Sequence, residues 1–220
     1  MPLYIVPTPL GNYSDITLRA KQVFADCQVV IGEEFRPTST LLKKIGLEQK
    51  EIYELNEHSK PQDIQGLVEL CRHQKVALVS DCGTPNFCDP GFQLIQPLRR
   101  EKIPITALPG PSSLALILSL SSQKIQQYTF EGFLPAEKNS RRQAIQNLVQ
   151  EKKAILILET PYRFVSLLSE LSEVMPKRKA LIGLDLTLET ELVEEGPLSA
   201  LHDKLKNHAK AEPILLIYPI

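Results

Sequence analysis

Short apolar runs alternate with helical patterns through the first 122 residues, and this alternation limits the possible folds most strongly. The runs are rich in Leu, Ile and Val, as buried parallel strands are; they lie at 3–6, 28–31, 51–53, 76–79 and 103–108. Between them apolar residues recur at helical spacing, for example Ile64, Leu67, Val68 and Cys71. Parallel strands need crossover connections, so the pattern predicts an α/β domain with a mainly parallel sheet.

The polar segment 121–127 is the best candidate for a linker. After it, strand patterns at 128–133, 154–158, 180–186 and 214–218 are interspersed with helical patterns. A chain of 220 residues is long enough for two small domains with cores of their own. We therefore expect an N-terminal α/β lobe over 1–122 and a C-terminal α/β lobe over 123–220, with a ligand cleft between them.

Composition excludes little. The chain has 25 basic and 26 acidic residues, so a nucleic-acid partner would need a local basic patch. Lys138, Arg141, Arg142, Lys152 and Lys153 offer one candidate, with an ordinary solvated helix face as the alternative. The four cysteines follow no zinc-binding spacing, so no metal is expected. No signal peptide or membrane-spanning run is visible, which favours a cytoplasmic protein.

Five loops that follow strands and precede helices are expected to carry the chemistry: 7–12, 32–38, 81–86, 109–113 and 159–163. In an open α/β sheet, ligands bind just beyond the carboxyl ends of the strands. None of these loops has a dinucleotide or P-loop fingerprint, and all five lack Lys. Such loops suit a ligand that is not a polyphosphate, held by backbone groups and one carboxylate, Asp81. Asp89 and Pro90 read as the N-cap and first residue of the next helix. Ser14 or Asp15 is expected to cap an earlier helix.

Six segments match, in the same order, the motifs of one methyltransferase family. They are 3–20 with its Thr8-Pro9-Leu10-Gly11-Asn12 centre, Leu55-x-Glu57-His58, 76–91, 108–112, 131–135 and Glu159-x-Pro161-x-Arg163. In these residues the chain closely resembles the type I ribose 2′-O-methyltransferases of small-subunit ribosomal RNA. That S-adenosylmethionine-dependent family lies within the tetrapyrrole-methylase superfamily, the class III methyltransferases.

The resemblance implies a tetrapyrrole-methylase-like fold, usually a homodimer, with S-adenosylmethionine in the cleft between the lobes and structured ribosomal RNA as the substrate. It implies the following cofactor-binding residues: Pro9, Leu10, Asp81, Gly83, Thr84, Pro85, Gly110, Pro111, Ser112, Ser113 and Leu158. Asp81 can hold ribose hydroxyls or the methionine ammonium group, or it can cap its own loop. Ser112 and Ser113 can equally serve as helix caps.

Methyl transfer is an in-line attack on the sulfonium methyl group, and an alcohol nucleophile also needs a base. Glu33 or Glu34 can accept the proton, and Arg36 or Arg163 can hold a phosphate. The candidate catalytic residues are Glu33, Glu34, Arg36, Glu159, Tyr162 and Arg163. The alternative for this set is a solvated cluster of ion pairs.

The chain departs from the family at polar positions. It has Gly32-Glu33-Glu34-Phe35-Arg36 where the family has Ala-Glu-Asp-Thr-Arg, and Tyr162 where the family has His. Leu184 and Leu188 replace two basic residues. Two other functions therefore stay open: a methylase of tetrapyrroles or other small molecules, and a catalytically altered protein that binds the same cofactor.

Overall fold

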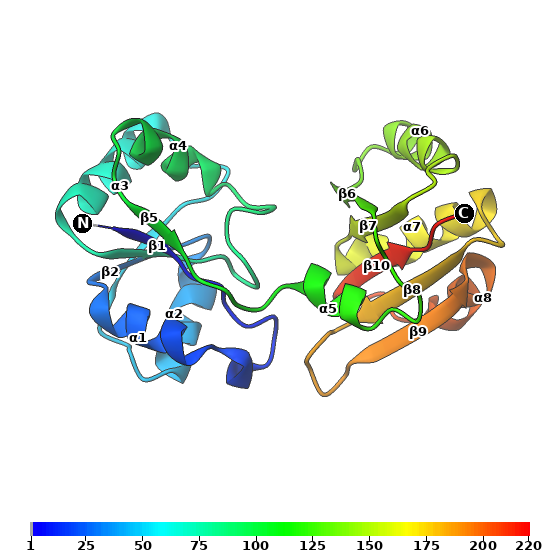
Figure 1. Ribbon diagram of the computed structural model, residues 1–220, viewed down its shortest axis with the longest axis horizontal. Coiled ribbons are helices and arrows are strands. Elements are labelled where there is room, and N and C mark those ends of the chain that lie inside the picture. The colour runs from blue at the N-terminus through cyan, green and yellow to red at the C-terminus, as the bar shows by residue number, and fades with distance from the viewer. Residues whose placement is uncertain (1) are drawn as a thin grey trace. The chain divides into compact units, whose positions relative to one another are not determined.

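The computed structural model describes residues 2–220. The chain divides into two compact units that meet between Ser112 and Ser113 (Figure 1). The predicted boundary after residue 122 falls beyond helix α5 (Ser113–Ser119), whose Ile117 packs on the sheet of the second unit. Within 2–220, no helix combines the length and the apolar character needed to cross a membrane.

The first unit is built on five parallel strands in the order β3-β2-β4-β1-β5. The strands are β1 (Leu3–Ile5), β2 (Val29–Gly32), β3 (Glu51–Glu54), β4 (Val76–Leu78) and β5 (Ile105–Ala107). The predicted parallel sheet is thus confirmed. Strands β2 and β4 are buried along their whole length, as their continuous apolar sequences require.

Helices cover both faces of this sheet. They are α1 (Leu18–Asp26), α2 (Phe35–Lys44), α3 (Pro61–His73) and α4 (Phe92–Arg100), with a short 3-10 helix, η1 (Tyr13–Asp15), before α1. Val30 packs with α1 and α2, whereas its neighbour Ile31 packs with α3 and α4, because successive strand residues point to opposite faces. Figure 1 shows α3 and α4 on one side of the strands and α1 and α2 on the other.

The strand order creates a switch point between β1 and β4. The chain leaves β1 through α1 towards β2, on one face, and leaves β4 through α4 towards β5, on the other face. At such a point the loops after the two strands diverge and leave a crevice for a ligand. The loops after β1 and β4 are therefore the expected location of a ligand-binding site.

Two helix starts differ from the predictions. Helix α1 is capped by Thr17, whose Oγ1 accepts the Ala20 N–H at 3.0 Å, so the predicted caps Ser14 and Asp15 fall in η1 instead. Helix α4 begins after Gly91, beyond the predicted start. Asp89 still caps this turn, since its Oδ1 accepts the N–H groups of Asn86 (2.6 Å) and Gly91 (3.3 Å).

The second unit has a mixed sheet in the order β6-β7-β10-β8-β9. Its elements after α5 are β6 (Tyr128–Phe133), α6 (Lys138–Leu148), β7 (Ala154–Leu158), α7 (Pro161–Val174), β8 (Lys179–Leu184), β9 (Leu192–Pro197), α8 (Leu198–Leu205) and β10 (Pro213–Ile217). Only β6 and β7 are parallel, and the other neighbours are antiparallel. The sequence patterns did not predict β9.

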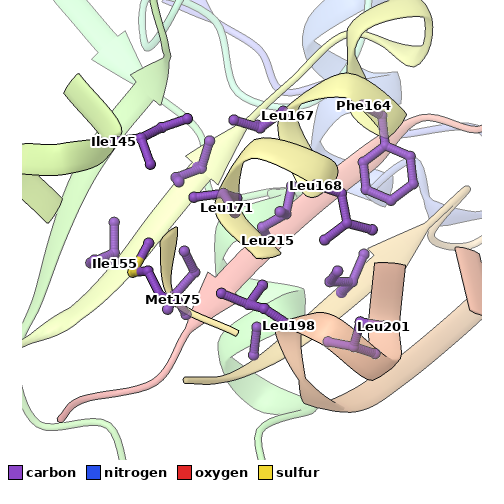
Figure 2. Close-up of a cluster of buried hydrophobic side chains, with 14 of the residues drawn as sticks. Ile145, Ile155, Phe164, Leu167, Leu168, Leu171, Met175, Leu198, Leu201 and Leu215 are labelled. Atoms are coloured by element: carbon purple, nitrogen blue, oxygen red, sulfur yellow. The ribbon is translucent and has the colours of Figure 1, made fainter. Parts of the chain in front are cut away.

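Its core has two layers. On one face α6, α7 and α8 bury Ile145, Leu168 and Leu201 against strand residues such as Leu215 (Figure 2). On the other face α5 covers alternate residues of the same strands, among them Leu216. Two complete cores explain why each half of the chain forms a compact unit.

Candidate functional site

Three loops of the first unit are joined at the carboxyl edge of its sheet. The loop after β1 and the loop after β4 form a small antiparallel bridge: Thr8 N–H donates to Gly83 O (2.8 Å), and Gly83 N–H donates to Thr8 O (3.1 Å). The hydroxyl of Thr84 donates to the carbonyl of Pro111 in the loop after β5 (3.0 Å). These bonds connect loops that are far apart in sequence, at the switch point identified above.

Two glycines allow the close approach. Gly83 has φ +78°, a conformation that side-chain-bearing residues rarely adopt, and a Cβ there would lie 3.1 Å from Leu10 Cδ2. A Cβ on Gly110 would lie 2.6 Å from Cβ of Pro7, closer than carbon atoms approach. The loops after β1, β4 and β5 can therefore pack this tightly only with glycine at both positions.

A cavity of about 160 Å³ lies where the loop after β1, the loop after β4 and helix α2 meet. Its lining comprises Thr8, Pro9, Leu10, Gly11, Tyr13, Pro37, Thr38, Leu41, Ser80 and Asp81. The predicted residues Pro9, Leu10 and Asp81 thus share one cavity. Sites for small molecules usually exceed about 300 Å³, so this cavity has room for only part of a cofactor-sized ligand.

Glu33 and Asp81 connect the ends of β2 and β4. Glu33 Oε1 accepts the Asp81 N–H at 3.2 Å, and the Glu34 N–H in turn donates to the Asp81 carboxylate. Burial raises the pKa of Glu33 to about 7, with help from the nearby carboxylates of Asp89, Asp81 and Glu57, although the Asp81 N–H lowers it. Burial also raises the pKa of Asp81. A carboxyl group that titrates near neutrality can act as a general base.

The other two first-unit candidates for catalysis lie further out. Glu34 is exposed at the N-terminus of α2, and Arg36 is exposed in its first turn, with Phe35 between them. The amide of Phe35 donates to Glu54 Oε1 at 2.8 Å, which fixes the start of the helix. Of the three charged candidates in this loop, only Glu33 lies in a desolvated position.

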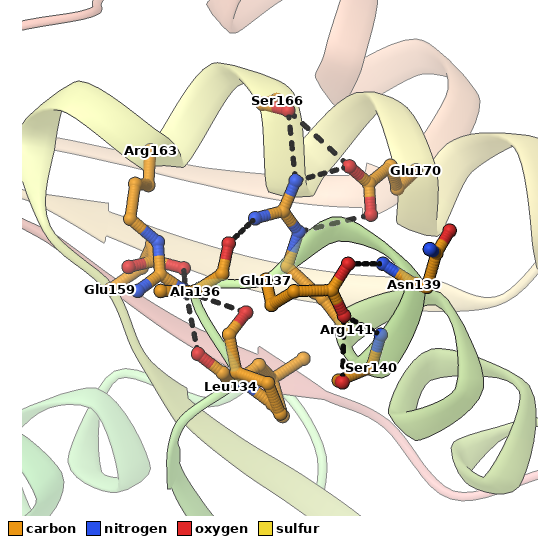
Figure 3. Close-up of polar contacts among 11 residues, drawn as sticks. Leu134, Ala136, Glu137, Asn139, Ser140, Arg141, Glu159, Arg163, Ser166 and Glu170 are labelled. Atoms are coloured by element: carbon orange, nitrogen blue, oxygen red, sulfur yellow. Dashed lines mark hydrogen bonds and ion pairs between the residues drawn. The ribbon is translucent and has the colours of Figure 1, made fainter.

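In the second unit, Glu159 and Arg163 form a largely buried ion pair (Figure 3). Arg163 Nη2 lies 2.9 Å from Glu159 Oε2, and the side chain of Glu159 has no exposed surface. The same Nη2 donates to the carbonyls of Leu134 (2.5 Å) and Pro135 (3.4 Å). The guanidinium therefore ties the start of α7 to the segment after β6. Glu159 Oε2 and Arg163 Nε are buried without a well-aligned hydrogen bond.

Tyr162, the third candidate there, is 89% exposed. The structure thus brings Glu159 and Arg163 together and leaves Tyr162 at the surface. Leu158, the expected cofactor residue of this unit, ends β7 and is half-buried. Its predicted contact with a cofactor stays a prediction.

A second buried pair, Arg141 with Glu170, joins α6 to α7. Arg141 Nη2 lies 2.6 Å from Glu170 Oε1, and Arg141 Nε donates to Glu170 Oε2 at 3.1 Å (Figure 3). The pairing lowers the pKa of Glu170. Only 8% of Arg141 is exposed, so its predicted place in a basic surface patch is wrong.

The remaining predicted cofactor residues lie in or beside the three joined loops. Gly83, Thr84, Gly110 and Pro111 make the contacts described above, Pro85 is buried next to them, Ser112 ends the first unit and Ser113 begins α5.

The sequence patterns missed Thr8 and Thr38 as lining residues. Thr8 Oγ1 donates to Ser80 O at 3.1 Å. A Cβ on Gly32 would overlap Thr38 Oγ1. The glycine at position 32 was therefore the one feature of the sequence that indicated a close neighbour there. Across residues 2–220, no three His, Cys, Asp or Glu side chains gather in a way that suits a metal.

Solved proteins share this architecture of two α/β units. The solved methyltransferase CobJ superposes with a TM-score of 0.72 at 13% identity, covering 99% of this chain and 93% of that one. Diphthine synthase superposes with a TM-score of 0.73 at 14% identity, covering 100% and 90%. At these identities the likeness shows the fold alone.

The chain belongs to the tetrapyrrole (corrin/porphyrin) methylases, whose family model matches residues 2–202. It is similar to proteins named ribosomal RNA small subunit methyltransferase I from Coprothermobacter proteolyticus (35% identical over 218 residues, 99% of this chain and 97% of that protein) and Leptospira borgpetersenii (34% over 220 residues, 98% and 87%). The resemblance seen in the sequence is confirmed, and the chain is a methyltransferase.

Proposed function

We propose that the chain transfers a methyl group from S-adenosylmethionine to a ribose 2′-hydroxyl of small-subunit ribosomal RNA. The observation that carries this proposal is the meeting of the loops after β1 and β4 with helix α2 around a cavity, and the carboxyl group of Glu33, with a pKa of about 7, bound to the backbone of the lining residue Asp81. The names of relatives at 34–35% identity support the acceptor.

The donor's fit rests on the first unit. Asp81 is exposed to a ligand and lines the cavity with Thr8 and Leu10, so it offers one carboxylate beside backbone and apolar surface. A carboxylate of this kind suits the ribose hydroxyls or the ammonium group of S-adenosylmethionine. When bound, this cofactor supplies a sulfonium methyl group that an oxygen nucleophile can attack. The cavity is smaller than the whole cofactor, so we propose that it holds one end.

Glu33 is the proposed base. Its carboxylate is anchored by the Asp81 N–H, and its pKa of about 7 leaves it partly deprotonated at neutral pH. A group with such a pKa accepts a proton from an alcohol more effectively than an ordinary glutamate does. We assign no proton transfer to Glu159, since its carboxylate is paired with Arg163 and has no exposed surface.

The loop after β8 is relevant to the methyl acceptor, because Leu184 and Leu188 stand there in place of the family's two basic residues. Leu184 at the end of β8 and Leu186 in the loop are buried, and Asp185 (φ 51°) and Thr187 (φ 73°) have a left-handed backbone conformation. Asp185 keeps this loop in place by accepting the Glu212 N–H (2.8 Å) and the Thr190 hydroxyl (2.9 Å). The absence of basic side chains from this loop favours one alternative, a protein that binds the donor without turnover.

Two measurements test the proposal. Calorimetry should show that the chain binds S-adenosylmethionine. Asp81→Ala should raise the Kd ten- to a hundredfold, because a hydrogen bond to a charged group contributes about 1.5–3 kcal/mol. Asp203→Ala, at an exposed position on α8, is the matched control. Labelled methyl transfer to small-subunit ribosomal RNA from cells lacking the gene then tests turnover. Binding without label would identify the catalytically altered protein, and label in a tetrapyrrole but not in RNA would identify a tetrapyrrole methylase.

Two further features belong to the same proposal. We propose that the chain forms a homodimer, as the family resemblance implies, and that it works in the cytoplasm, where ribosomal RNA is modified. Sedimentation of the purified protein tests the first, and fractionation of cells tests the second.

A further inference from the structure

A second, larger hollow lies on the second unit, away from the candidate cofactor-binding and catalytic residues, and it includes Lys152 and Lys153 of the basic patch expected from the sequence. It is an open groove of about 640 Å³ between the segment before β6, the end of α6 with the segment that leads into β7, and the end of the chain after β10. Three lysines line it, Lys124, Lys152 and Lys153, together with four carboxamide side chains from positions 126–127 and 147–150. No aromatic side chain is part of the lining.

The three lysines are available to a ligand. All three are exposed, and across residues 2–220 no carboxylate forms an ion pair with any of their ammonium groups. The one acidic residue of the lining, Glu151, is engaged locally, because its Oε1 accepts the N–H of Lys153 at 2.8 Å. The lining therefore carries three positive charges against the single negative charge of Glu151, a net excess of positive charge.

One guanidinium holds the walls of the groove in place. Arg178 donates from Nη1 to Leu148 O (3.0 Å), from Nη2 to Glu151 O (2.8 Å) and Lys153 O (3.3 Å), and from Nε to Tyr218 O (2.9 Å). These carbonyls belong to two of the three walls. The third wall is tied in by the Ala154 N–H, which donates to Gln127 O at 3.3 Å. These bonds fix the backbone from which the lysine side chains extend, so binding does not have to order that backbone.

We propose that this groove binds the phosphate backbone of the RNA substrate, an inference that rests on the proposed function. Lysines bind phosphates as point charges, and carboxamides contact phosphate and sugar oxygens. A flat macrocycle would stack on aromatic side chains, and this lining has none. The groove lies at the Ala154 end of β7, and Leu158 lies at the other end of the strand. Five residues of extended chain, about 17 Å, separate Leu158 from Lys153 in the groove. The groove therefore contacts RNA some nucleotides away from any group bound near Leu158.

The test compares two triple variants of equal charge. The groove variant is Lys124→Gln/Lys152→Gln/Lys153→Gln, and the control is Lys21→Gln/Lys206→Gln/Lys210→Gln, at exposed positions outside the groove. Binding of small-subunit ribosomal RNA is measured at several salt concentrations. Each lost phosphate contact lowers the slope of log Kd against log salt by about 0.7–0.9. We expect the groove variant to lose about 2–3 in slope and at least tenfold in affinity at 0.1 M salt, with S-adenosylmethionine binding unchanged.

The outcomes separate the two proposals. A wild-type slope in the groove variant, or an equal loss in the control, overturns the inference while leaving the proposed function intact. If the groove variant loses heparin binding but keeps RNA binding, the groove serves another polyanion and the inference is wrong. If the wild-type protein itself neither binds nor methylates the RNA, the proposed function fails and the inference fails with it.

Discussion

Replacing Glu33 by Gln removes the proposed base without changing the size of the side chain. The amide oxygen of Gln can still accept the Asp81 N–H, so the link between the ends of β2 and β4 should survive. What is lost is the ability to take up a proton near neutral pH. The variant therefore separates the chemistry of the residue from its structural role.

The magnitude follows from the pKa shift. In the folded chain the pKa of Glu33 rises from 4.5 to about 7, mainly because the carboxyl group is buried. Between these two pH values the folded chain keeps a proton that the unfolded chain has released. The associated stability is thus complete below pH 4.5 and is lost as the pH rises through about 7. A shift of this size corresponds to about 3 kcal/mol, which solvent screening at a half-buried site reduces to about 1–2 kcal/mol.

Two assays follow. In urea denaturation at pH 8, Glu33→Gln should raise the free energy of unfolding by about 1–2 kcal/mol, and the gain should vanish near pH 4.5. In methyl transfer, kcat should fall by about 10²–10⁴-fold, and the rise of the wild-type rate through pH 7 should disappear. Glu48→Gln, at an exposed position of the same unit, is the control.

A wild-type pH profile in Glu33→Gln would refute the assignment of the base. If Glu34→Gln flattens the profile instead, the neighbouring carboxylate is the base, and burial was the wrong criterion for choosing between them.

Two further predictions concern packing. Gly110→Ala should destabilise the first unit by about 1–3 kcal/mol and weaken donor binding, because the new Cβ would overlap Pro7. The control is Gly66→Ala on α3, where the Cβ would meet no other atom; it should stabilise the first unit by up to about 1 kcal/mol. Equal effects of the two in calorimetry and thermal unfolding would contradict the loop geometry. Arg141→Ala should cost about 3 kcal/mol because it leaves the Glu170 carboxylate unpaired, whereas Arg141→Met with Glu170→Leu should cost much less. If denaturation shows that the single variant loses no more free energy of unfolding than the double variant, the pair is solvated.

The inner strands of the first sheet could be predicted because they are short, apolar and separated by clear helical patterns. Strand β9 could not, since Leu192–Pro197 carries two glutamates, a glycine and a proline and lies half-exposed at the edge of its sheet. An edge strand has little of the apolar burial that makes a strand visible in sequence.

The candidate site was predictable as a set of loops but not as a set of contacts. Asp81 could be predicted from its place just after a buried strand, whereas Thr8 lines the cavity and is bonded to Ser80, far along the chain. The burial of Glu159 was equally hidden, because it depends on the segment that supplies Leu134 to its partner Arg163. Local patterns predict which loops meet at an edge, and packing decides which side chains remain open there.

The most direct test of the proposed function is the transfer of a labelled methyl group from S-adenosylmethionine to small-subunit ribosomal RNA purified from cells lacking the gene. We predict label at one ribose 2′-oxygen, with strong loss of the label for both Asp81→Ala and Glu33→Gln. RNA that remains unlabelled by a wild-type protein shown to bind S-adenosylmethionine would contradict the proposed function.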